Sequence, residues 1–106
     1  MTLGRLERYK EAKAVLRKIL PVEQRLLGKE NRTTFKTRCL YARVLYCDPG
    51  ATLDDVREAV TTLEEIDRAA RRVLGGAHPT TTLIEDALRD ARSVLRARET
   101  TSPGSA

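Results

Sequence analysis

One turn sequence occurs twice in this chain, 47 residues apart, and this repeat is the strongest constraint on its fold. The stretch Leu27–Phe35 (LGKENRTTF) returns as Leu74–Thr82 (LGGAHPTTT). A Glu-Ala pair precedes each copy, and its alanine, Ala12 or Ala59, lies 15 residues before the leucine both times. A period of this length with helical patterning is typical of arrays of stacked helix pairs. The sequence therefore predicts an all-α fold, a short α-α superhelix of about four antiparallel helices.

Chain length and residue types agree with a small helical domain. A chain of 106 residues supports one modest hydrophobic core, so a large enclosed active site is not expected. Aromatic residues make up only 4% and tryptophan is absent, while leucine, valine and alanine dominate the apolar residues, which favours interlocking helices over a β-sandwich. We expect one repeat domain over residues 1–98 and a disordered polar tail over 99–106.

Apolar residues at steps of three and four predict four helices, over residues 5–27, 33–47, 52–74 and 80–98. Pro21 removes a backbone donor inside the first, so a kink or break is expected near Leu20. Asp48-Pro49-Gly50 predicts a chain reversal between the second and third.

Glycine and threonine mark the predicted helix ends. Gly28 and Gly75 fit the position after a helix, where a left-handed backbone is common. Thr33 or Thr34 is expected to cap the second helix, Thr52 the third, and the run Thr80-Thr81-Thr82 the fourth. Asp54 and Asp55 in the first turn of the third helix suit the helix dipole.

The residues of the second turn carry a resemblance to a known family. Leu74-Gly75-x-x-His78-Pro79-x-Thr81, together with Tyr9-Lys10-Glu11-Ala12, resembles the kinesin light chain type of tetratricopeptide repeat over about residues 3–98. This resemblance implies hairpins of an A and a B helix, with the four helices in the order B, A, B, A. Asn31-Arg32 replaces His-Pro in the first turn, and an insertion at Asp48–Thr52 lengthens the period. The repeat-turn positions are Leu27, Gly28, Thr34, Leu74, Gly75, His78, Pro79 and Thr81.

The resemblance also implies where a partner would bind. A helices line a concave groove in this family, and a basic, partly apolar face suits an acidic peptide with a hydrophobic anchor. Leu40 stands where the family often has asparagine, a departure that weakens the match to a peptide-backbone clamp. The groove-facing positions carried over onto the second helix are Lys36, Cys39, Leu40, Arg43 and Tyr46.

The first helix lacks its A partner in this arrangement. An exposed apolar strip is therefore expected among Leu6, Tyr9, Val15 and Leu16, unless another chain or a further segment covers it. We hypothesise that the chain associates with itself or joins a larger assembly, as a non-catalytic scaffold that binds another protein.

Nucleic-acid binding is the less favoured alternative. The net charge of +5 permits it, and seven arginines of the third and fourth helices form a basic stripe. Acidic residues interleave with that stripe and no aromatic residue is placed to stack on bases, so a protein partner is preferred. The stripe comprises Arg68, Arg71, Arg72, Arg89, Arg92, Arg96 and Arg98.

Neither histidine nor cysteine indicates catalysis, a metal or a cofactor. His78 is the only histidine and belongs to the turn, where it is expected to bond a backbone carbonyl. Cys39 and Cys47 lie about 12 Å apart along one helix, too far for a disulfide, and half-buried free thiols are expected. Free thiols favour a reducing compartment, so the predicted location is cytoplasmic, with no membrane span.

Overall fold

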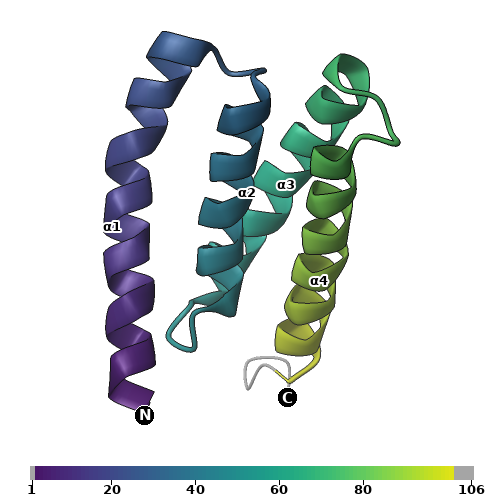
Figure 1. The fold of residues 1–106 in the computed structure, drawn as a ribbon. Helices are drawn as coiled ribbons and strands as arrows, with labels where there is room; N and C mark the ends of the chain where they lie inside the picture. Colours follow the sequence, from purple (N-terminus) through teal and green to yellow (C-terminus); the bar gives the residue numbers. More distant parts are fainter. Residues whose placement is uncertain (1, 102–106) are drawn as a thin grey trace.

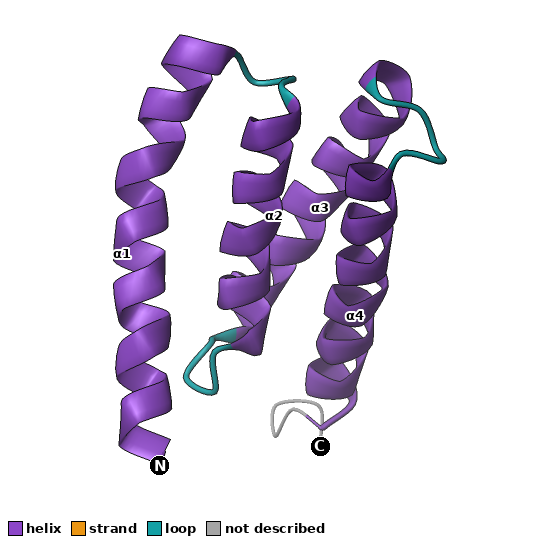
Figure 2. Cartoon of the chain, in the orientation of Figure 1, coloured by secondary structure: helices purple, strands orange, loops and turns teal. Residues whose placement is uncertain are grey.

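The computed structural model describes the backbone of residues 2–101 and the side chains of residues 8–100, and this part of the chain consists of helices and short loops, without strands (Figures 1 and 2). The prediction of an all-α chain with four helices packed against one another is confirmed. The helices are α1 (Thr2–Leu27), α2 (Arg32–Cys47), α3 (Leu53–Val73) and α4 (Pro79–Thr101).

Helix α2 occupies the centre of the arrangement. It contacts α1, α3 and α4, whereas α4 contacts α2 and α3, and α1 contacts α2 alone. Figure 1 shows α1, α2 and α4 in one row, with α3 passing behind α2 and α4. An Arg17 to Tyr41 hydrogen bond of 3.1 Å adds a polar link between α1 and α2.

The core lies between α2, α3 and α4. Helix α3 places one apolar side inward at steps of three and four residues, as an amphipathic helix does when it covers a core. None of the fully buried residues belongs to the described part of α1, so this helix packs onto the core from outside. The largest fully buried apolar side chains are Phe35, Leu45, Val56, Leu63, Ile66 and Ile84.

The caps of α2 and α4 differ from the predicted threonines. Asn31 caps α2, its Oδ1 accepting from the Thr33 amide at 2.8 Å. His78 precedes α4, and its Nδ1 accepts from the Thr80 amide at 3.1 Å, so it bonds an amide and not the expected carbonyl. The threonines lie inside the first turns because the preceding side chain already satisfies an orphan amide there.

The third helix begins as predicted. Thr52 is its N-cap and forms a capping box with Asp55, in which each side chain accepts from the other residue's amide at 3.1 Å. The preceding turn is closed by Asp48, whose Oδ1 accepts from the Gly50 amide at 2.9 Å.

Both predicted glycine corners are present with the same backbone geometry. Gly28 and Gly75 each have φ of 91°, the left-handed conformation that follows a helix end. No atom lies within 4 Å of a Cβ built at either position, so glycine is required there by backbone conformation and not by crowding.

Two predicted features are corrected. Helix α1 runs unbroken through Pro21, so the predicted break is absent; proline removes a single donor, and its exposed position leaves the freed carbonyl to water. Helix α4 extends to Thr101, so residues 99–101 of the predicted tail are helical. Residues 102–106 lie outside the described part.

Candidate partner-binding face

The structure divides the five predicted binding residues between surface and core. Lys36, Leu40 and Arg43 lie on one exposed side of α2, at steps of four and three residues. Cys39 and Tyr46 are buried in the core, so their prediction as surface residues is wrong. The reason is that α2 packs against three other helices, which leaves it one narrow exposed side.

An open apolar groove of about 500 Å³ lies between α1 and α2. Leu40, which is 47% exposed, lies on its α2 side. Of the strip predicted on the first helix, Val15 and Leu16 line this groove, while Tyr9 is half-buried and the Leu6 side chain lies outside the described residues. The α1–α2 groove is lined by Arg8, Glu11, Ala12, Val15, Leu16, Leu40 and Val44.

The exposed apolar surface of α1 continues beyond the groove. Val15, Ile19, Val22 and Leu26 are all exposed and are spaced by four, three and four residues, so they form one stripe along the helix. Of these four residues, the strip predicted from the sequence included only Val15. A heptad-like spacing of apolar residues was the available signal.

Comparison of the two repeats identifies what is uncovered. The repeat of 47 residues aligns Leu16 with Leu63 and Ile19 with Ile66. Leu63 and Ile66 are fully buried, whereas Ile19 is 39% exposed and Leu16 is intermediate. In the second repeat α2 packs against both α3 and α4, whereas the described residues place no equivalent helix against α1 and α2.

Charge is distributed unevenly along the chain. Residues 1–47 contain twelve basic and four acidic side chains, whereas residues 48–106 contain eight basic and eleven acidic ones. Among the described basic side chains of α1 and α2, only Arg38 forms an ion pair with a carboxylate, Glu65 at 3.3 Å. The surface around the α1–α2 groove is therefore positive and largely unneutralised.

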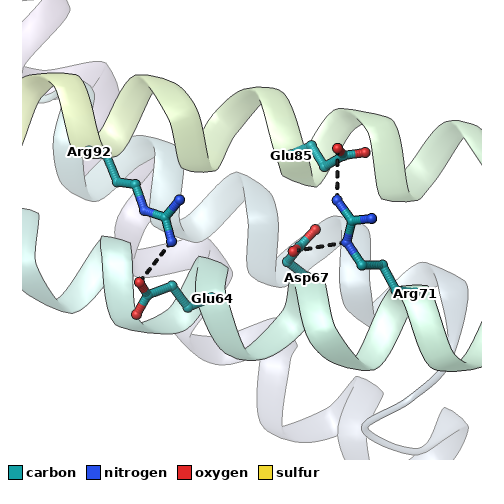
Figure 3. A network of polar contacts seen from close by, with 5 residues as sticks. All are labelled: Glu64, Asp67, Arg71, Glu85 and Arg92. Carbon is teal, nitrogen blue, oxygen red and sulfur yellow. Dashed lines mark hydrogen bonds and ion pairs between the residues drawn. The ribbon is translucent and has the colours of Figure 1, made fainter. Parts of the chain in front are cut away.

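The opposite face, between α3 and α4, is polar and its charges are paired (Figure 3). Arg71 lies between Asp67 and Glu85, at 3.1 and 2.8 Å, and these hydrogen bonds and charges, those of Asp67 first, raise the pKa of its guanidinium. Arg92 reaches Glu64 at 3.0 Å. The α3–α4 face comprises Asp67, Arg71, Glu85, Leu88, Arg89, Arg92, Ser93 and Arg96.

The predicted arginine stripe is thus mostly paired with neighbouring acids. Arg72 pairs with Glu30, Arg89 pairs with Asp86, and Arg98 donates to the Ala51 carbonyl. Among the described side chains of residues 8–100, Arg68 and Arg96 have no carboxylate within ion-pair distance. A phosphate chain approaching this face would have to displace internal partners.

The repeat-turn residues lie together at the two corners. The Thr34 hydroxyl donates to the Gly28 carbonyl at 2.9 Å, whereas the Thr81 hydroxyl is buried with no hydrogen-bond partner among the described residues. Leu27 is exposed and Leu74 packs partly against the core. Pro79 is the first residue of α4, the helix position that tolerates proline best.

The two thiols have different surroundings, which corrects the prediction that both are half-buried. Both are free; Cys39 is buried and Cys47 is exposed. Burial raises the pKa of the Cys39 thiol to about 11, with Arg43 opposing the shift. Burial also raises the pKa of Tyr46, to about 12.

The described side chains of residues 8–100 do not form a metal site, since no group of three or more potential metal-ligating side chains gathers among them. Nor does any helix in this range combine the length and apolar character needed to cross a bilayer. Comparisons of the chain with protein-family models, with curated proteins and with solved structures found no match.

Proposed function

We propose that this chain is a non-catalytic protein–protein interaction module, a short tetratricopeptide-like solenoid that binds a partner through the surface of α1 and α2. The observation that carries this proposal is the α1–α2 groove, an open apolar surface on a small, highly charged protein. Contiguous exposed apolar surface of this kind marks interaction sites.

The helix contacts support the solenoid architecture. Each helix contacts the next one in sequence, and α2 also contacts α4, two positions along, while no contact joins the described residues of α1 and α3. This is the pattern expected when alternate helices form an inner and an outer layer. The matching φ angles at Gly28 and Gly75 support two equivalent corners.

The binding surface proposed here is shifted from the predicted one. It keeps Leu40, Lys36 and Arg43 of α2 and adds the exposed side of α1. The nucleic-acid alternative gains little support from the α3–α4 face, because most of its arginines are bound to acids of the same chain.

Site-specific photo-crosslinking in the native cell tests this function. A photoreactive residue at Val15, which is 52% exposed in the groove, is expected to capture a protein partner. The matched control is Val73, which is 45% exposed at the end of α3 and away from the groove, and is expected to capture none. Equal capture at both positions, or capture at neither, would contradict the proposal.

A further inference from the structure

We infer that the α1–α2 groove binds an acidic amphipathic helix supplied by another protein, seated against α1 and α2 as α2 is seated against α3 and α4. This inference rests on the proposed function and specifies the partner. Three observations carry it: the repeat comparison, the charges around the groove, and the polar character of the opposite face.

The repeat comparison indicates the shape of the occupant. In the second repeat, Ala59, Leu63 and Ile66 of α3 are fully buried beneath α2 and α4. Their equivalents Ala12, Leu16 and Ile19 form the same surface on α1 but remain partly open. A helix is therefore the element that fits this groove. Helix α2, which packs on α3 and α4, shows the apolar pattern required, with buried residues at Phe35, Cys39, Ala42 and Leu45.

The charges around the groove indicate the chemistry of the occupant. Arg8 lines the groove, and Lys36 and Arg43 flank Leu40 on the exposed side of α2. None of these three side chains pairs with a carboxylate among the described side chains of residues 8–100, and Glu11 is the one acid among the described residues that line the groove. Glutamate and aspartate on the flanks of an incoming helix would supply the missing counter-charges, which improves both association rate and specificity.

A second copy of this chain is a poor occupant for two reasons. Two α1–α2 faces brought together would place positive surfaces against each other. The other face offers no apolar helix either: the buried Phe35, Ala42 and Leu45 of α2 align with Thr82, Arg89 and Arg92 of α4, which are all exposed. Leu83 is the one large apolar side chain exposed on the described part of α4.

Three synthetic helical peptides of about 20 residues test this inference. All three carry the same apolar residues at positions i, i+3, i+4 and i+7, and their remaining positions are mainly Glu, Gln or Lys. Fluorescence anisotropy with the intact chain at about 0.15 M salt measures binding. The Glu peptide is expected to bind about tenfold more tightly than the Lys peptide, with the Gln peptide between them.

Matched variants locate the binding. Val15→Glu is expected to weaken binding of the Glu peptide by about tenfold or more, while Val73→Glu leaves it unchanged. Arg8→Glu is expected to weaken the Glu peptide and strengthen the Lys peptide, while Arg96→Glu on the α3–α4 face changes neither. Circular dichroism confirms that each variant remains helical, and any variant that fails this check is replaced by Leu40→Gln.

The remaining outcomes separate the acidic and helical character of the occupant from the proposed function. Equal binding of the Glu and Gln peptides overturns the acidic chemistry and leaves the proposed function intact. If no peptide binds but photo-crosslinking at Val15 still captures a protein, the inference of a helical occupant is overturned and the proposed function stands. Failure of both experiments overturns both proposals. Sedimentation at about 0.15 M salt, where repulsion between the positive faces is expected to keep the chain monomeric, tests the alternative occupant: a dimer abolished by Val15→Glu under that condition overturns the inference and identifies a second copy as the occupant.

Discussion

Asn31 and His78 occupy the same position in the two repeats and cap their helices with different chemistry. Each offers one planar acceptor atom, Oδ1 or Nδ1, to the amide two residues later. Residue preferences alone favoured the neighbouring threonines, because threonine is a common cap and histidine is not. The correct cap could have been found by aligning the copies, which places Asn31 on His78.

This equivalence predicts how His78 can be replaced. His78→Asn should keep the free energy of unfolding close to that of the parent chain, because asparagine performs the same function in the first repeat. His78→Ala leaves the Thr80 amide unpaired and should lose about 1 kcal/mol. Urea unfolding followed by circular dichroism measures both. Equal losses for the two variants would refute the capping role of the imidazole.

The buried thiol predicts a loss of stability at alkaline pH. Burial raises the pKa of Cys39 from 9.0 to about 11, so the folded chain holds the thiol proton more tightly than the unfolded chain does. This contribution is fully present below pH 9 and is lost as the pH rises toward 11, at roughly 2 kcal/mol in all. Tyr46, with its pKa raised to about 12, extends the loss to higher pH.

Urea unfolding at several pH values between 8 and 11 tests this linkage. Cys39→Ala should be less stable at neutral pH but should lose less stability over that range than the parent chain, since it has no buried thiol to ionise. Cys47→Ala is the exposed control and should stay closer to the parent profile. Parallel profiles for the parent and Cys39→Ala would contradict the assignment.

The four helices differ in how firmly the rest of the chain holds them. Helix α3 is packed against α2 and α4, whereas α1 contacts α2 alone and exposes Val15, Ile19, Val22 and Leu26. Segments with few buried contacts open at lower free energy than the global unfolding of a domain. Helix α1 should therefore open locally before the other three.

Hydrogen exchange tests this difference between elements. Central amides of α1 are expected to exchange about tenfold faster or more than central amides of α3. Backbone exchange rates by nuclear magnetic resonance give this comparison residue by residue. Equal protection in the two helices would show that α1 and the core unfold as one unit.

The sequence predicted where the helices lie along the chain, but it did not predict which side of α2 faces solvent. The apolar spacing of α3 and the capping residue Thr52 are local signals, so its position and start were predicted to within one residue. The failure at Cys39 and Tyr46 has another origin. Which side of α2 faces solvent depends on its packing against three helices, and the spacing of residues within α2 does not contain that information.

At the scale of the whole molecule, residues 1–47 carry an excess of basic side chains and residues 48–106 a small excess of acidic ones. The acids of α3 and α4 mainly neutralise arginines of the same chain, so the net positive charge is concentrated on α1 and α2. Like charges should oppose contact between two α1–α2 faces, and salt screens such repulsion without weakening apolar contact.

Self-association should therefore respond to ionic strength. Sedimentation at high protein concentration should show monomer at low salt and a rising fraction of dimer toward about 1 M NaCl, where the screening length falls to about 3 Å. Val15→Glu should abolish this dimer and Val73→Glu should not. A dimer favoured by low salt would contradict this prediction. It would mean that the basic α1–α2 surface of one copy attracts the acidic residues of α3 and α4 in another.

The aligned residues of α2 and α4 also bear on how such a protein could be lengthened by design. A helix pair added before Thr2 would pack against the apolar surface that α1 and α2 already expose. It would need only a suitable linker. A helix pair added after Thr101 would lie on Arg89, Arg92 and Ser93, which align with Ala42, Leu45 and Tyr46 of α2. These three polar residues would first have to be replaced by Ala, Leu and Tyr. Extension of this array is thus favoured in one direction only.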